Sequence, residues 1–142
     1  MRVQINGEEH TIAEGLTILG MMGEAGKLSA AESVAIVQRI TSQCAVPVIV
    51  GVSAAGFSAM KALSNEAMDA GAAGVMVAPS SGLRTDAQII DYFHNTADAL
   101  GEIPFVLQDF PLATGVQIST SVILKIVEDC PTCVMLKHED WP

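Results

Sequence analysis

The feature that most constrains the fold is a regular alternation of apolar runs with segments of helical periodicity. The apolar runs lie at 16–20, 46–52, 74–79, 104–109 and 133–137, and the helical segments between them lie at 30–42, 57–70, 85–100 and 119–129. The spacing of about thirty residues is that of a strand–helix–strand unit. Because the runs are continuously apolar, they are typical of parallel strands buried on both faces. The pattern predicts an α/β fold with one parallel sheet and right-handed crossovers.

Short polar signals mark where the expected elements begin. Ser29, with Glu32 three residues later, has the capping-box pattern of a helix start. Ahead of the repeat, the runs at 2–5 and 10–13 flank Asn6–Gly7, the residue pair that two-residue hairpin turns favour. We therefore expect a short N-terminal β-hairpin before the strand–helix repeat.

Composition and charge limit the classes of partner. The chain has 142 residues, enough for one domain, and 50% of them are hydrophobic while only 4% are aromatic. The 16 acidic residues outnumber the 7 basic ones and give a net charge of −9, which argues against nucleic acid and anionic membrane surfaces as partners. No apolar run is long enough to span a bilayer, and the polar start lacks the apolar core of a signal peptide. We expect a cytoplasmic protein.

The remaining motifs point to neither a metal nor a cofactor. The pair Cys130 and Cys133 is a C-x-x-C that suits a redox site or half of a zinc site. No second pair and no suitably spaced histidines accompany it, and Cys133 opens an apolar run, so a turn cysteine followed by a buried cysteine is the favoured interpretation. The chain has no P-loop and no G-x-G-x-x-G, and the glycine spacing at 20–26 is only a weak nucleotide-loop signal.

Two architectures fit the alternation, an open doubly wound sheet and a (β/α)8 barrel. Both place active sites at the carboxyl ends of the parallel strands. Lys137 and Gln108 stand at the ends of neighbouring expected strands, where they can converge on one ligand. A lysine at the end of an apolar strand is either a surface charge or a reactive amine, and on this pattern alone the surface charge is the preferred interpretation.

Several segments agree in order and spacing with one enzyme family. They are the G-x-x-G-E of 20–24 followed by Leu28–Ser29, the A-x-x-A-G-A-x-x-V-M-V join of 67–77, and a lysine on the strand that follows "TGV". From Leu16 onwards the chain resembles the dihydrodipicolinate synthase / N-acetylneuraminate lyase family of class I aldolases. The resemblance implies a (β/α)8 barrel whose lysine, here Lys137, forms a Schiff base with pyruvate or another 2-oxo acid, without an added cofactor.

The resemblance also assigns substrate-binding residues. The loop that holds the substrate carboxylate corresponds to Gly20, Met21, Met22, Gly23 and Glu24. Two methionines replace residues that are hydroxylic in many members of the family, so the loop binds through backbone N–H groups. The usual tyrosine of the family falls on Gln108, which can donate a hydrogen bond but cannot act as an acid or base. An arginine found in many members falls on Ala113, which makes a lysine-biosynthesis substrate doubtful.

The length departs from that of a complete barrel, which takes about 250 residues. The expected strands match the second to sixth of the family, so we expect a partial barrel of about five βα units over 16–142 and a hairpin extension over 1–15. Self-association into a homo-oligomer would complete the site, and the alternative is a catalytically inactive fragment or interaction module. After Lys137, His138 is expected to point the opposite way, and Glu139 and Asp140 are expected to be solvated.

Overall fold

The computed structural model describes residues 2–5, 8–11 and 15–139. The N-terminal strands β1 (Arg2–Ile5) and β2 (Glu8–Thr11) form an antiparallel two-stranded sheet of their own, in which Ile5 pairs with Glu8. The expected hairpin is confirmed. Its second strand begins at Glu8 and not at 10, because backbone pairing between the two strands extends as far as Ile5 and Glu8. The predicted turn at Asn6–Gly7 lies outside the described residues.

The strand–helix repeat builds a five-stranded parallel sheet, as predicted. Its strands lie side by side in the order β3-β4-β5-β6-β7, which is also their order along the chain. Their bounds are β3 Leu16–Ile18, β4 Val48–Gly51, β5 Gly74–Val77, β6 Phe105–Asp109 and β7 Cys133–His138. A sheet whose strand order never reverses is that of a barrel segment, whereas a doubly wound sheet changes direction part-way across.

The helices follow the expected segments and begin at polar caps. Their bounds are α1 Ala30–Thr41, α2 Phe57–Asp69, α3 Asp86–Leu100, α4 Pro111–Thr114 and α5 Thr120–Asp129, with short 3-10 turns η1 Met21–Gly23 and η2 Ala25–Lys27. The capping box of Ser29 and Glu32 forms at the start of α1, and Thr85 with Gln88 makes a second one at α3. The short α4 was not predicted. Its first residue, Pro111, suits a helix start, but a helix of one turn is too short to show a periodic pattern in the sequence.

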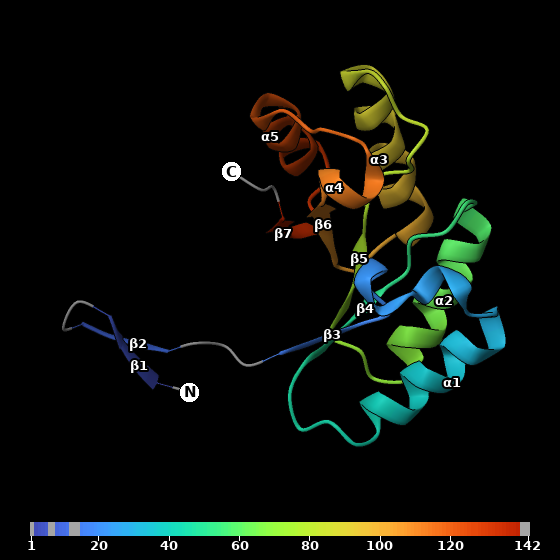
Figure 1. The fold of residues 1–142 in the computed structure, drawn as a ribbon, viewed down its shortest axis with the longest axis vertical. Helices are drawn as coiled ribbons and strands as arrows, with labels where there is room; N and C mark the ends of the chain where they lie inside the picture. The colour runs from blue at the N-terminus through green and yellow to red at the C-terminus, as the bar shows by residue number, and fades with distance from the viewer. Residues whose placement is uncertain (1, 6–7, 12–14, 140–142) are drawn as a thin grey trace.

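The long helices α1, α2, α3 and α5 cover one face of the sheet and form an arc around its strands in Figure 1. Alternate strand residues pack with them in a single apolar core, which includes Val50, Val75, Val77, Phe105 and Leu107 from the strands and Val37, Met60, Phe93 and Ile126 from the helices. The intervening strand residues point to the other face, which we call the inner face. Helices on one face favour the barrel segment over the doubly wound sheet, whose helices cover both faces.

Strand β7 pairs with β6 through an irregular register. Phe105 pairs with Cys133, but the next residue, Val106, pairs with Met135, so Val134 is the extra residue of a β-bulge. Beyond it Leu107 pairs with Leu136 and Gln108 pairs with Lys137. The bulge therefore determines which residue of β7 stands beside Gln108.

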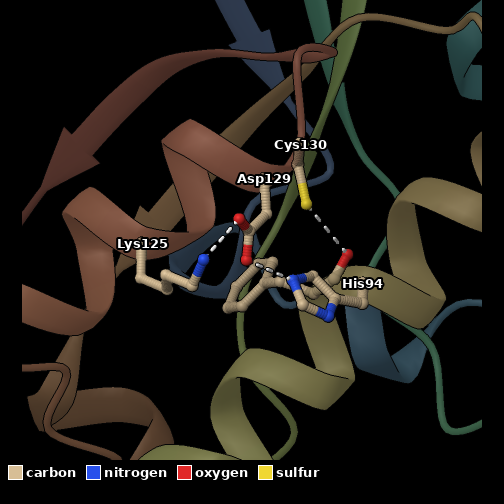
Figure 2. A network of polar contacts seen from close by, with 5 residues as sticks. His94, Lys125, Asp129 and Cys130 are labelled. Atoms are coloured by element: carbon tan, nitrogen blue, oxygen red, sulfur yellow. Dashed lines mark hydrogen bonds and ion pairs between the residues drawn. The ribbon is translucent and has the colours of Figure 1, made fainter.

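A polar network joins α5 to α3 on the outer surface (Figure 2). The carboxylate of Asp129 accepts hydrogen bonds from Lys125 Nζ at 2.7 Å and from His94 Nε2 at 2.9 Å. One residue further along, the buried Cys130 thiol donates to the carbonyl of Phe93, with a sulfur–oxygen distance of 3.8 Å. The contacts of Asp129 with His94 and of Cys130 with Phe93 both join the end of α5 to the middle of α3. They therefore fix the position of α5 on α3.

Candidate active site

Three polar side chains meet at the carboxyl ends of β6 and β7. Gln108 and Lys137 are paired residues of adjacent parallel strands, so their side chains leave the sheet on the same, inner face. Glu139 joins them, because its Oε1 accepts a hydrogen bond from Gln108 Nε2 at 2.6 Å and lies 2.5 Å from Lys137 Nζ. The predicted convergence of Gln108 and Lys137 is confirmed, and the two side chains meet at Oε1 of Glu139.

The environment of this carboxylate favours its charged form. The side chain of Glu139 is 26% exposed and that of Lys137 is 40% exposed, while Gln108 is buried. Burial by itself raises the pKa of the Glu139 carboxyl, but the hydrogen bonds from Lys137 and Gln108 outweigh burial and hold the pKa below its usual value. The resting site is therefore a carboxylate held between an ammonium group and an amide.

The prediction that Glu139 is solvated was wrong. The expected strand ended at Lys137 or His138, whereas the backbone N–H of Glu139 still donates to the carbonyl of Asp109 at 2.7 Å. Two residues apart on an extended chain, Lys137 and Glu139 point to the same face, and this alternation is the sequence signal that locates the carboxylate. Asp140 lies outside the described residues.

His138 occupies the opposite face, as expected. Its Nδ1 lies 2.8 Å from Oδ2 of Asp109, which is buried at the end of β6. The last two rungs of the β6–β7 ladder therefore carry two polar pairs on opposite faces, Gln108 with Lys137 and Asp109 with His138. The histidine is held by its carboxylate partner and turned away from the lysine.

The loop after β3 is bent onto the inner face by an unusual backbone conformation. Leu19 has a φ of 53°, in the left-handed region that a bulky residue rarely adopts. Its carbonyl oxygen lies where a side chain at position 51 would stand, because a Cβ added to Gly51 would come within 2.2 Å of it. Gly51 is thus required by the close approach of the Leu19 backbone. The Gly20–Glu24 loop starts from this contact.

A cleft of about 900 Å³ lies beside this loop. Residues of the inner face form its floor, among them Gly51, Ser53, Met76 and Gln108, and Met21 contributes from the loop. The walls continue between α1 and α2 and consist mainly of alanine and leucine side chains. Gln108 links the cleft to the site, since it lines the cleft and also binds Glu139. In the described part of the chain Lys137 does not itself line the cleft, and Glu139 and Gln108 connect it to the cleft floor.

Of the residues predicted in the Gly20–Glu24 loop, only some lie at the cleft. Met21 lines it, whereas the side chain of Met22 is largely exposed. Glu24 is an exposed residue whose carboxylate accepts from Lys27 Nζ at 2.6 Å. A Cβ added at Gly20 or Gly23 would meet open space, so the backbone of the loop is accessible. Their proposed role in holding a carboxylate stays a prediction.

The C-x-x-C pair lies away from the cleft on the helix side of the sheet. Cys130 ends α5 and Cys133 opens β7, and both thiols are buried. Burial raises the pKa of the Cys133 thiol to about 11 and also raises that of Cys130. Thiols held in the protonated form are poor nucleophiles and poor metal ligands. The structure thus supports the packing role, although Cys130 is itself buried and is not an exposed turn residue.

Comparison with known sequences decides the family. The profile of the dihydrodipicolinate synthetase family matches residues 2–139. The chain belongs to this family. A 4-hydroxy-tetrahydrodipicolinate synthase of Methanococcoides burtonii is 34% identical over 116 residues, which are 80% of this chain and 39% of that protein.

Solved structures of the family agree with the fold described above. The crystal structure of dihydrodipicolinate synthase from Rhodopseudomonas palustris has a TM-score of 0.85 and 52% identity, over 89% of this chain and 42% of that one. YagE, a family member from Escherichia coli K12 solved in complex with pyruvate, has a TM-score of 0.78 and 28% identity over 87% of this chain and 42% of that one. The chain is thus similar to about two fifths of these relatives and forms part of the family barrel.

In the described part of the chain, none of the helices has both the length and the apolar character needed to cross a membrane.

Proposed function

We propose that the chain carries out aldolase-type lyase chemistry on a pyruvate-like 2-oxo acid through a Schiff base on Lys137. The observation that carries the proposal is the meeting of Lys137 Nζ and Gln108 Nε2 on one carboxylate at the carboxyl ends of two barrel strands. A primary amine in this position attacks a carbonyl carbon, and the iminium that results draws electrons from the neighbouring carbon–carbon bond. Membership of the family supports the assignment.

The cleft supports a role for each of the other predicted residues. Gln108 orients the bound adduct from the cleft floor, and the Gly20–Glu24 loop seats the carboxylate of the 2-oxo acid. The N–H groups at the start of the loop serve this role, because those of Gly23 and Glu24 donate to carbonyls within the loop. Glu66 is the charged residue among those that line the cleft in the described part of the chain, and no lysine or arginine lines it there. A second carboxylate on the substrate would find no basic partner among these lining residues, so a substrate with a single carboxylate is favoured.

Covalent trapping tests the proposal. The chain is incubated with pyruvate and borohydride, and the reduced adduct is located by peptide mass spectrometry. We expect the label on Lys137 and none in Lys137→Arg, because a guanidinium group is not a nucleophile at neutral pH. The matched control is Lys125→Arg, whose exposed lysine on α5 also pairs with a carboxylate. An unlabelled wild-type chain, or equal labelling of Lys125, would contradict the proposal.

The alternative is a catalytically inactive interaction module, and the free edge of the sheet favours it. The apolar side chains of Val134, Met135 and Leu136 are exposed on β7, which pairs only with β6 in the described part of the chain. The same edge supports self-association into a homo-oligomer, because an unpaired parallel strand is a template for another chain. An inactive module would bind a partner equally well with or without Lys137.

A further inference from the structure

We propose that Glu139 is the proton-transfer group of the Schiff-base site, an inference that rests on the proposed function of Lys137. Its Oε1 lies 2.5 Å from Lys137 Nζ, the atom that would form the bond to the substrate. Gln108, which by the resemblance stands at the position of the family tyrosine, donates to the same oxygen at 2.6 Å, but an amide is neither an acid nor a base at neutral pH. By the same resemblance, Met21 and Met22 stand where many members of the family have hydroxylic residues. The carboxylate is thus the titratable group that contacts the amine in the described site.

The geometry also explains how a protonated lysine becomes a nucleophile. The hydrogen bond from Lys137 Nζ to Glu139 Oε1 already lies along the path of a proton, so the first step moves that proton from nitrogen to oxygen. It leaves a neutral amine beside a neutral carboxylic acid. A substrate bound against the two groups would exclude water from them and would favour this neutral pair over the ion pair.

The remaining steps return every proton. The amine attacks carbon 2 of the 2-oxo acid, the carbon–nitrogen bond forms, and the carbonyl oxygen takes the proton from Glu139. The carboxylate then takes a second proton from the nitrogen of this carbinolamine and gives it to the hydroxyl group. That group leaves as water when the carbon–oxygen bond breaks and the nitrogen lone pair forms the iminium. Glu139 ends as a carboxylate, and the lysine has lost two protons to the water.

Gln108 has a positioning role in this scheme. It is buried at the end of β6, and its amide holds Glu139 Oε1 from the cleft side. The oxygen is therefore held between the lysine amine and the amide of Gln108, which connects the pair to the cleft. A second donor on the same oxygen also keeps the carboxylate from following the flexible lysine side chain.

The experiment measures the rate at which pyruvate and borohydride label Lys137. Glu139→Gln keeps a hydrogen-bond acceptor of the same shape but cannot carry the proton, so we expect a rate at least about 10²-fold lower, with the label still on Lys137. Glu139→Ala is expected to be equally slow and to recover when formate is added, because formate supplies the missing carboxylate. Glu128→Ala, which removes an exposed glutamate from α5, is the control that formate leaves unchanged.

Each outcome separates this inference from the proposed function. Labelling of wild type on Lys137, with Glu139→Gln as fast as wild type, would overturn the role of Glu139 and leave the Schiff base intact. Slow variants that formate fails to rescue would overturn proton transfer, since a carboxylate that only positions the lysine is not replaced by a free one. An unlabelled wild-type chain would overturn both. Circular dichroism of each variant checks that the fold is retained.

Discussion

Lys137 shows how strongly the surroundings of one residue decide its chemistry. On an open surface its ammonium would be an ordinary charge, but here it shares a carboxylate with a buried amide on the inner face of a barrel segment. The carboxylate pairs with the lysine at rest and, in the proposed scheme, takes up its proton when a substrate binds. The same contact is therefore compatible with a lysine that is only a paired charge and with one that is a reactive amine. Labelling with pyruvate and borohydride distinguishes the two.

Gly51 is the residue on which the cleft geometry depends most directly. A methyl group at this position would meet the Leu19 carbonyl oxygen at 2.2 Å, so we expect Gly51→Ala to destabilise the chain by about 1–3 kcal/mol through overpacking against backbone. Urea denaturation followed by circular dichroism measures the change. Gly82→Ala is the control, since a Cβ there meets open space. Equal stability of the two variants would mean that the Leu19 backbone yields at little cost.

Sequence reasoning found the residues of the site that lie within the strands and missed the one just beyond. Lys137 and Gln108 were predicted because each stands where an apolar run ends, and a motif supported the lysine. Glu139 was assigned to solvent because charged residues after a strand are usually exposed. Its position follows from alternation, which carries the inner face two residues further, and from a backbone hydrogen bond that no residue pattern reveals.

At the scale of elements, the exposed carboxylate of Asp129 adds a polar contact to the apolar packing of α3 against α5. The hydrogen bond from Lys125, against a smaller effect of burial and together with that from His94, lowers the pKa of Asp129 (Figure 2). A carboxyl whose folded-state pKa is depressed binds protons more readily when unfolded, so it stabilises the fold above its unfolded pKa of about 3.9. That stability is lost as pH falls through the folded-state pKa.

We therefore expect Asp129→Asn to lower the free energy of unfolding at neutral pH, with a difference from wild type that shrinks as the pH falls below about 4. Denaturant titrations at a series of pH values measure it. Asp91→Asn, which changes an exposed aspartate of α3, is the control. A difference that stays constant over the acid range would mean that the network contributes by packing and not by charge.

The start of a long helix was easier to predict from the sequence than the existence of a short helix within a loop. The hydroxyl of Ser29 and the carboxylate of Glu32 form the capping box that the spacing indicated, because capping uses atoms within one turn of chain. The single turn α4 could not be found in the same way. It buries Thr114 through contacts within its own loop, and a four-residue helix has no apolar stripe to read.

For the whole molecule, the parallel sheet was predictable and the choice between its two architectures was not. Inner-face residues such as Met76 and Val106 are as apolar and as buried as the core residues Val75 and Leu107. Periodicity therefore gives no sign that helices cover only one face. The family motifs in the sequence favour the barrel, and the one-sided arrangement of helices agrees with them.

The exposed edge of β7 leads to a prediction about association. We expect the chain to self-associate and Val134→Lys, at the edge, to raise the fraction of monomer, because a lysine on an edge strand blocks pairing with another chain. Light scattering after size-exclusion chromatography, over a range of concentrations, measures the fraction. Leu124→Lys on α5 is a matched control, since Leu124 is 64% exposed and Val134 is 62% exposed. Equal behaviour of the two variants would place the contact elsewhere.

Because of the bulge at Val134, the number of residues between Cys133 and Lys137 determines which residue of β6 lies beside the lysine. Cys133 is anchored in the core, and one extra residue after it brings Lys137 beside Gln108. In an unbulged ladder Leu136 would stand beside Gln108, and Lys137 would stand beside Asp109 on the helix side. The four-residue distance from Cys133 to Lys137 is therefore as much a requirement of the site as the lysine itself. One residue inserted in that short interval, with the bulge retained, would place Leu136 beside Gln108 in place of the lysine while leaving every strand in place.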